Sequence, residues 1–308
     1  MTGTTKTIME TYQVRKSKGQ KKAFASYVES LATAWGYSFR REKGALGVTN
    51  LVVGDVSRAK VVYTAHYDTC PVLPFPNFIT PKNIFIYLLY NILLVCGFFA
   101  VAFAAGFVGG VLSALLPVFG GLATLLGYVI YFGFVFLLLC GPANKHTAND
   151  NTSGVTLLVD LMREMPPELR DEVAFVFFDL EEMGLIGSSA FASAHKKEMK
   201  NRLLVNFDCV SDGEHMLFVL RKGANAHRKA IEEAFAARDG FRVEVAEKGV
   251  FYPSDQAKFR CGVGVAALRA TKGGLLYMNR IHTSRDVIYR EENIEFLKEG
   301  AIKLPSLL

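Results

Sequence analysis

The stretch EVAFVFFDLEEMG, residues 172–184, decides the fold. Its six consecutive apolar residues predict a strand that is covered on both faces, as in a parallel sheet packed between helices. Two adjacent carboxylates, Glu181 and Glu182, follow directly after that strand. Like charges held together at the mouth of a sheet are costly without a cation. The stretch therefore predicts a central strand of an α/β sheet, with an acidic site at its carboxyl end.

Apolar periodicity on either side of this stretch predicts further strands and helices. The predicted strands cover residues 50–53, 60–65, 172–179, 203–207, 216–220, 241–245 and 263–268. The predicted helices cover residues 19–37, 154–165, 224–237 and 291–303. Strands that alternate with helices predict an α/β fold with a mixed, mostly parallel sheet covered by helices on both faces.

One stretch breaks this pattern, because residues 83–144 contain no Asp, Glu, Lys, Arg or His. Residues 84–105 would span ~33 Å as a helix, enough for a ~30 Å hydrocarbon core. Glycines at 106, 109 and 110 are expected to end this first span, and residues 121–140, with a start near Pro117, form a second. A pair of buried core helices would almost always carry a charge. The sequence therefore predicts a transmembrane helical hairpin at 83–144, inserted into a discontinuous globular domain of residues 1–82 and 145–308.

The charge distribution favours a lipid surface over nucleic acid. The net charge is +6, and basic residues crowd the N-terminal segment at Arg15, Lys16, Lys18, Lys21 and Lys22. No nucleic-acid-binding module accompanies them, so nucleic acid is not an expected partner. A basic patch that faces the anionic lipid of a bilayer is the better interpretation.

The five cysteines are an odd number without CxxC spacing, which predicts neither a disulfide framework nor a thiolate zinc site. Small buried hydrophobes are the expected role. The N-terminal 19 residues are polar and do not resemble a signal peptide. Both features favour an intracellular location for the globular domain.

Five short clusters carry the polar chemistry. They are Ala65-His66-Tyr67-Asp68-Thr69, Asn149-Asp150-Asn151-Thr152-Ser153-Gly154, Glu181-Glu182, Asn206-Phe207-Asp208 and Ile281-His282-Thr283. Most of them follow a predicted strand or begin a predicted helix, where ligands gather in open α/β sheets. Imidazole and carboxylate donors without thiolate favour zinc or a similar divalent ion.

The order His-x-Asp, Asp-Asn-x-Ser-Gly, Glu-Glu-x-Gly-x-x-Gly-Ser, Asn-x-Asp and His-Thr resembles the co-catalytic zinc aminopeptidase family, peptidase family M28. The resemblance runs from about Gly19 to the C-terminus and omits the apolar insertion. It implies the zinc-dependent exopeptidase fold and two zinc ions. By position, Asp150 would bridge both ions, Glu182 and His282 would complete one site, and His66 and Asp208 the other.

The resemblance also assigns two further roles. Glu181 would act as the general base, and Asp68 would orient the ring of the zinc-binding histidine. Ser254-Asp255-Gln256 resembles a Ser-Asp-His segment near the family's substrate site. Gln256 replaces the histidine, which puts the family's substrate contacts in doubt but leaves the metal ligands intact.

These features predict a membrane-anchored di-zinc metallo-aminopeptidase that acts on the N-terminus of short peptides. The alternatives are a glutaminyl-cyclase-like transferase with one zinc, an amidase acting on acylated amino acids or lipids, and a non-catalytic receptor. A receptor of this fold would lack metal ligands, and none is missing here. The insertion joins two loops that carry site residues and is flanked by Lys82 and Lys145. The positive-inside rule then predicts an integral membrane protein with a cytoplasmic catalytic domain. The sequence makes no prediction of oligomeric state.

Overall fold

A single sheet organises the protein. The computed structural model describes residues 1–115, 120–238 and 240–308, without the side chains of residues 120–124. The strands are β1 (Phe39–Lys43), β2 (Thr49–Gly54), β3 (Val61–His66), β4 (Val173–Phe178), β5 (Leu203–Phe207), β6 (His215–Leu220), β7 (Arg242–Ala246), β8 (Gly262–Ala270) and β9 (Leu276–Tyr277). They are ordered β1-β2-β4-β3-β5-β8-β6-β7, with β9 paired to β8. Strands β4, β3, β5 and β8 are parallel, whereas β1–β2, β2–β4 and β6–β8 pair antiparallel.

Strand β4 lies in the middle of the sheet, and all six of its residues are buried. Its side chains alternate between the two faces: Phe175 and Phe177 enter the larger core, and Val176 and Phe178 the smaller one. Burial of each such side chain contributes roughly 1.5–3 kcal/mol to folding. The prediction of a strand covered on both faces is confirmed.

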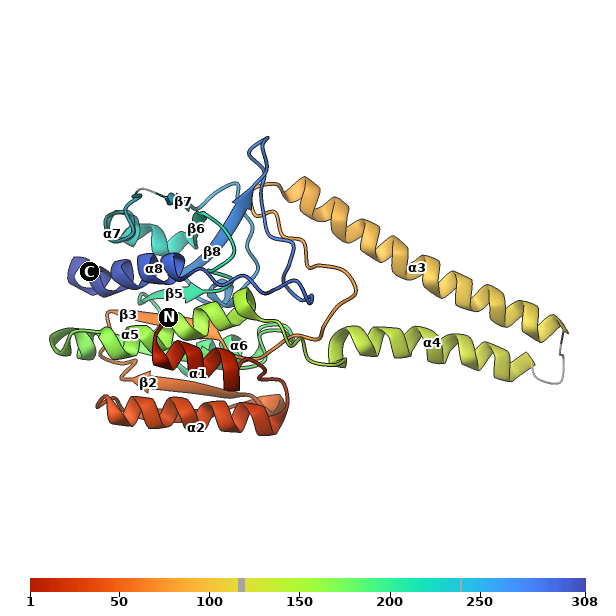
Figure 1. Ribbon diagram of the computed structural model, residues 1–308, viewed down its shortest axis with the longest axis horizontal. Helices are drawn as coiled ribbons and strands as arrows, with labels where there is room; N and C mark the ends of the chain where they lie inside the picture. Colours follow the sequence, from red (N-terminus) through yellow and green to blue (C-terminus); the bar gives the residue numbers. More distant parts are fainter. Residues whose placement is uncertain (116–119, 239) are drawn as a thin grey trace.

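Helices cover both faces (Figure 1). They are α1 (Gly3–Thr11), α2 (Lys18–Ala34), α3 (Ile84–Leu115), α4 (Gly120–Cys140), α5 (Gly154–Glu164), α6 (Ile186–Ala194), α7 (Arg228–Ala234) and α8 (Glu291–Lys303). Buried residues of α1, α2, α5, α7 and α8 join the larger core, and Phe191 of α6 joins the smaller one. The predicted α/β architecture is therefore confirmed.

Local differences from the predictions have physical causes. Strand β1, sequence FRREK, lies at the end of the strand order. It was not predicted, because its four charged residues leave no alternation of apolar and polar side chains. The predicted helix at 224–237 is divided into a 3₁₀ turn, Lys222–His227, and the shorter α7. Helices α1 and α6 were also missed.

Helices α3 and α4 extend away from the sheet as a pair (Figure 1). The predicted end of the first span at the glycines is wrong, because α3 continues through all three of them to Leu115. A glycine costs a helix only about 1 kcal/mol, and small residues let two helices approach closely. A Cβ atom on Gly127 of α4 would lie 3.4 Å from the carbonyl oxygen of Ala105. The predicted start near Pro117 lies outside the described residues.

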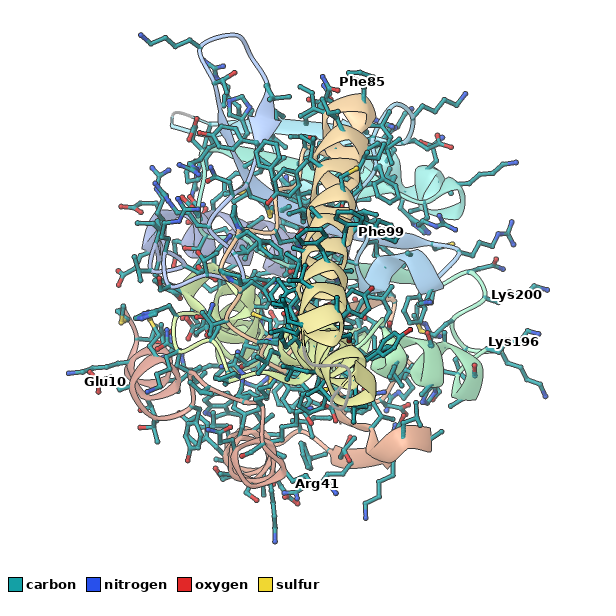
Figure 2. All side chains as sticks on the ribbon, turned by 90° about the vertical axis from the view of Figure 1, so that its right-hand side faces the viewer. Glu10, Arg41, Phe85, Phe99, Lys196 and Lys200 are labelled. Carbon is teal, nitrogen blue, oxygen red and sulfur yellow. The ribbon has the colours of Figure 1, made fainter. Side chains whose placement is uncertain are left out.

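Within the described ranges, α3 is the one helix that is long and apolar enough to cross a membrane, and the described apolar part of α4, Leu125–Cys140, is shorter. Only 6% of the most apolar window of α3 is buried, unlike the core helix of a soluble protein. Figure 2 looks onto the face from which this helix extends, with Phe85 and Phe99 along it.

The chain enters and leaves the helical pair at the same place. The backbone N–H of Val72 donates to the carbonyl of Pro142, and that of Asn144 donates to the carbonyl of Cys70. Cys70 follows shortly after the end of β3, and Asn144 shortly precedes α5. The pair therefore begins and ends beside the edge of the sheet at which β3 terminates.

Candidate metal centre

The predicted ligands meet at the carboxyl-terminal edge of the sheet. His66 ends β3, Asp208 directly follows β5, and Glu182 is the fourth residue after β4. Asp150 shortly precedes α5, and His282 lies in the loop between β9 and α8. Because β3, β4 and β5 are parallel, their ends bring these residues to one edge.

The first cluster contains His66, Asp150 and Asp208, all of them buried. Nε2 of His66 lies 3.2 Å from Oδ1 of Asp150 and 3.5 Å from Oδ1 of Asp208. One donor atom from each residue lies within 4.8 Å of the others. One nitrogen and two carboxylate oxygens at this spacing suit a single zinc ion.

The second cluster shares Asp150 with the first. Nε2 of His282 lies 3.1 Å from Oδ2 of Asp150 and 3.2 Å from Oε2 of Glu182. Asp150 therefore directs one carboxylate oxygen to each histidine, and a single carboxylate joins the two clusters. Its peptide bond to Asn151 is cis.

Cys70 belongs to the second cluster, where one donor atom each from Cys70, Asp150, Glu182 and His282 lies within 4.8 Å of the others. The sequence predicted a buried hydrophobe here. A lone cysteine four residues after the end of β3 gives no spacing signal, so only the fold reveals its neighbours.

The electrostatics of the edge fit a cation. Burial raises the pKa of Glu182 to about 8 and that of Glu181 well above its ordinary value. Burial lowers the pKa of His282, but the charges of Glu182 and Asp150 outweigh this effect and raise it to about 9. Oε1 of Glu182 and Nδ1 of His66 are buried and have no hydrogen-bond partner in the described part of the chain. Clustered carboxylates and the unpartnered buried oxygen of Glu182 fit a divalent ion such as zinc.

Asp68 connects the first histidine with the acidic loop. Its Oδ1 lies 3.5 Å from Nδ1 of His66. The two carboxylate oxygens also accept the backbone N–H groups of Glu181 and Glu182 at 3.0 and 3.3 Å. The Glu181 side chain comes close to His66 and Glu182. Asp68 is therefore placed to fix both the imidazole ring and the loop that carries the two glutamates.

Left-handed backbone conformations gather around these residues. Leu180, Cys209 and His282 have φ of 54°, 58° and 62°. Non-glycine residues in this region cost of order 1–3 kcal/mol each, and such strain clusters at functional sites. The first two directly precede or follow predicted site residues, and the third is itself a predicted ligand.

Two supporting residues hold the ligands: Asp286, which the sequence analysis did not find, and Ser254, which lies in the segment that resembles the family's Ser-Asp-His segment. Asp286 accepts the backbone N–H groups of Asn149 and Asp150 at 2.8 and 2.9 Å. Ser254 donates to Oδ2 of Asp208 at 2.5 Å. These contacts join segments more than 40 residues apart, so spacing carries no sign of them.

Gln256 lies behind the site and is buried. Its side chain donates to the carbonyl of Tyr252 at 2.7 Å and accepts from Asn206 at 3.4 Å. Its neighbour Asp255 is fully buried, and neither carboxylate oxygen has a hydrogen-bond partner among the described residues. Burial raises the pKa of Asp255 to about 7.

Arg15 corrects the predicted basic patch, because it is fully buried and does not face solvent. Its Nε donates to the carbonyl of Tyr67 at 2.5 Å, and its guanidinium also contacts Thr152. Burial lowers its pKa to about 10, against the charges of Asp68 and Asp150. Arg15 therefore packs beneath the site, where its charge opposes that of the carboxylates.

A cavity of about 270 Å³ opens onto both clusters. The predicted metal ligands and Glu181 are among the residues that line it. The lining also includes Asn77, Ile79, Tyr252 and Pro253. The first two belong to the segment that leads into α3, so the root of the helical pair forms part of the cavity wall.

Comparisons with known proteins agree with this geometry. The profile of peptidase family M28 matches residues 134–299, more than half of the chain. A comparison with curated protein sequences gives no match.

Solved structures share the fold at low sequence identity. Legionella pneumophila LapA aminopeptidase is 14% identical, with a TM-score of 0.57, over 99% of this chain and 68% of that one. A Zn-dependent exopeptidase from Parabacteroides distasonis is 13% identical, with a TM-score of 0.58, over 96% and 94%. Porphyromonas gingivalis glutaminyl cyclase is 14% identical, with a TM-score of 0.57, over 98% and 95%. Because the family profile matches more than half of its length and the solved structures share its fold, the chain belongs to peptidase family M28 and is a zinc-dependent metallopeptidase.

Proposed function

We propose that this protein is a membrane-anchored two-zinc aminopeptidase that hydrolyses the N-terminal residue from short peptides. The observation that carries the proposal is the position of Asp150, whose two carboxylate oxygens lie 3.2 and 3.1 Å from His66 and His282. In this proposal His66, Asp150 and Asp208 hold one zinc ion. Asp150, Glu182 and His282 hold the other.

Glu181 is the proposed general base. Zinc in these sites would supply Lewis acidity, which polarises a carbonyl and lowers the pKa of water. Glu181 lines the cavity close to His66 and Glu182, and its backbone N–H donates to Asp68, so its carboxylate would stand beside a water that the metals polarise. It would accept a proton from that water and donate it to the departing amine.

The size of the cavity supports a small substrate. Its volume of about 270 Å³ is below the ~300–1,000 Å³ of common ligand pockets. Such a cavity has room for one residue and the bond that follows it. Its many carboxylates also offer partners for a free α-ammonium group, as an aminopeptidase requires.

The test compares matched peptides with free and acetylated N-termini. A free α-amine should be required, so acetylation should abolish turnover, and a chelator should abolish hydrolysis of the free peptide. Equal cleavage of both peptides would instead indicate an endopeptidase or an amidase.

Glutaminyl cyclization is the second candidate function. A Bacteroides thetaiotaomicron glutaminyl cyclase shares this fold with a TM-score of 0.58 and 12% identity over 97% of this chain. An N-terminal glutaminyl peptide separates the two reactions, because hydrolysis adds water and releases glutamine, whereas cyclization releases ammonia. The proposal expects free glutamine. Ammonia release with an otherwise intact peptide would favour the cyclase.

The membrane anchor is the proposed role of residues 83–144, inserted between the two parts of a catalytic domain, 1–82 and 145–308. The 32 residues of α3 extend ~48 Å, more than a ~30 Å hydrocarbon core requires. Phe85, Phe99 and Phe103 are more than 60% exposed, which is unfavourable in water but suits lipid.

The catalytic domain is proposed to face the cytoplasm, because Lys82 and Lys145 flank the uncharged hairpin. In oriented vesicles, protease should digest the domain only from the cytoplasmic side. Replacement of residues 84–140 by a short Gly/Ser linker should yield a soluble protein. Digestion from the outside alone would reverse the orientation, and a linker variant that still partitioned into membranes would refute the hairpin as the main anchor.

A further inference from the structure

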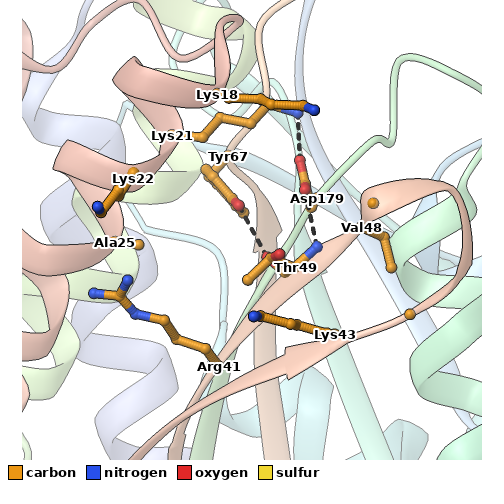
Figure 3. Close-up of a pocket in the computed structure, with 12 residues that line it drawn as sticks. Lys18, Lys21, Lys22, Ala25, Arg41, Lys43, Val48, Thr49, Tyr67 and Asp179 are labelled. Carbon is orange, nitrogen blue, oxygen red and sulfur yellow. Dashed lines mark hydrogen bonds and ion pairs between the residues drawn. The ribbon is translucent and has the colours of Figure 1, made fainter.

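A second cavity, of about 480 Å³, lies between α2 and β1 (Figure 3). Five cationic side chains line it: Lys18, Lys21, Lys22, Arg41 and Lys43. Arg41 and Lys43 are two residues apart on β1 and therefore point to the same face of the sheet. Asp179 is the one carboxylate among the described lining residues. This arrangement, called the basic cavity below, has a strong excess of positive charge.

Most of this charge is not neutralised within the protein. Lys18, Lys22 and Lys43 are exposed and form no ion pair with any described residue. Lys21 pairs with Asp179 at 2.5 Å, and Arg41 pairs with Glu29 at 2.5 Å. Three unpaired ammonium groups around one hollow repel each other, and an anion in the hollow would relieve that repulsion.

The basic cavity opens at the same edge of the sheet as the metal centre. Lys43 ends β1 and is paired in register with Thr49, whose backbone N–H donates to Asp179 at 3.0 Å. Asp179 lies two residues before Glu181. The roots of α3 and α4 also lie beside this edge. If the hairpin spans a bilayer, the lipid headgroups therefore lie next to this edge of the sheet, where the basic cavity also lies.

An exposed apolar residue accompanies the cations. Leu46, in the turn Ala45–Gly47 that follows β1, is 80% exposed and has φ of 59°. Apart from the hairpin and Met1, four other large apolar side chains are exposed. They also lie in loops beside the metal centre or the hairpin root: Val72, Met183, Phe251 and Val287. An apolar side chain beside clustered cations is the pattern of a surface that contacts anionic lipid.

We propose that the basic cavity binds the phosphate of an anionic phospholipid headgroup while Leu46 enters the acyl boundary. The three unpaired lysines supply charge complementarity, and the exposed Leu46 favours a lipid over a soluble anion. This inference rests on the proposed membrane anchor but not on the proposed peptidase reaction. The site would fix the catalytic domain against the bilayer at a second point, separate from the hairpin.

The test uses the full chain in uncharged detergent and titrates dioctanoyl phosphatidylglycerol by calorimetry, with dioctanoyl phosphatidylcholine as the uncharged comparison. Each cation near anionic lipid is worth roughly fivefold in affinity. The triple variant Lys18→Gln, Lys22→Gln and Lys43→Gln should therefore bind phosphatidylglycerol on the order of hundredfold more weakly. Phosphatidylcholine should bind weakly to both proteins.

A matched control removes the same charge elsewhere. Lys196, Lys197 and Lys200 are exposed and lie between α6 and β5, at the opposite edge of the sheet; Figure 2 shows Lys196 and Lys200 at the side of the molecule. Their triple Gln variant should bind phosphatidylglycerol within twofold of the wild type. Equal losses in both triple variants would overturn the site, because net charge alone would then explain the binding.

The source of the phosphate is tested separately. Leu46→Ser should weaken binding of phosphatidylglycerol but leave any binding of inorganic phosphate unchanged. Inorganic phosphate that bound as tightly as the lipid would overturn the lipid assignment. All readouts are binding constants, so failure of the peptidase reaction would not affect them. Failure of the anchor would appear independently, as loss of the wild-type chain from membranes.

Discussion

Asp68→Asn tests how the centre is held together. The substitution keeps the shape of the side chain but replaces one acceptor oxygen by an N–H donor. In the wild type, the two oxygens accept the N–H groups of Glu181 and Glu182 at 3.0 and 3.3 Å, and Oδ1 also lies 3.5 Å from Nδ1 of His66. The asparagine side chain can accept a hydrogen bond from only one of these two N–H groups. Its own N–H₂ group would then face the other N–H group, and two donors cannot bond to each other.

The expected loss follows from these contacts. A buried donor left without a partner costs about 1–3 kcal/mol. Substitution of residues that orient metal ligands lowers metal affinity or activity about 10–100-fold, which is ~1.4–2.7 kcal/mol. The variant should therefore bind zinc 10–100-fold more weakly and lose a similar factor in kcat/KM when zinc is limiting.

Competition with a chromophoric chelator measures the affinity, and thermal unfolding with zinc absent separates loss of fold from loss of metal. Unchanged zinc affinity and unchanged kcat/KM would refute the positioning role of Asp68. A glutamate substitution is a useful control, because it keeps the charge but displaces the oxygens, and it should be no better than asparagine.

Five further substitutions, two of them comparisons, probe individual residues. Glu181→Gln should keep both metals but lower the rate ~10²–10⁴-fold, whereas Glu182→Gln should also lose metal; an active Glu181→Gln protein would contradict the assignment of the base. Gly154→Ala should destabilise the fold by about 1–3 kcal/mol, since the new Cβ would lie 2.3 Å from a backbone oxygen. Gly19→Ala in α2 should not, because its Cβ would meet only Oγ of Ser17, at 3.9 Å; equal melting temperatures of the two variants would argue against the clash. Cobalt-loaded wild-type protein should show no sulfur-to-cobalt charge-transfer absorption, because Asp150, Glu182 and His282 are the proposed ligands of the second site; such absorption, if Cys70→Ser abolished it, would add Cys70 to that site.

The central sheet could be predicted because its pattern is local. The apolar run of β4 and the polar clusters that follow the strands carry their information within a few residues, and the structure places all seven predicted site residues together at one edge. Strand β1 could not be predicted, since its charged residues give no apolar alternation. The length of α3 was underestimated, because a glycine costs a helix only about 1 kcal/mol and does not have to end it.

The supporting contacts of the site were also beyond the reach of spacing. Arg15 carries a charge that normally marks the surface, yet it is fully buried beneath the site. Asp286 and Ser254 hold Asp150 and Asp208 from distant parts of the chain. Such contacts depend on tertiary packing, which gives no periodic signal in one sequence.

Metal stoichiometry tests the shared carboxylate most directly. Purified wild-type protein should contain close to two equivalents of zinc by elemental analysis. Asp150→Ala should lose metal from both sites, whereas His66→Ala and His282→Ala should each retain about one equivalent, because Asp150 alone contacts both histidines. A fully active wild-type protein with one equivalent, or an Asp150→Ala protein that retains a complete site, would contradict the two-zinc centre.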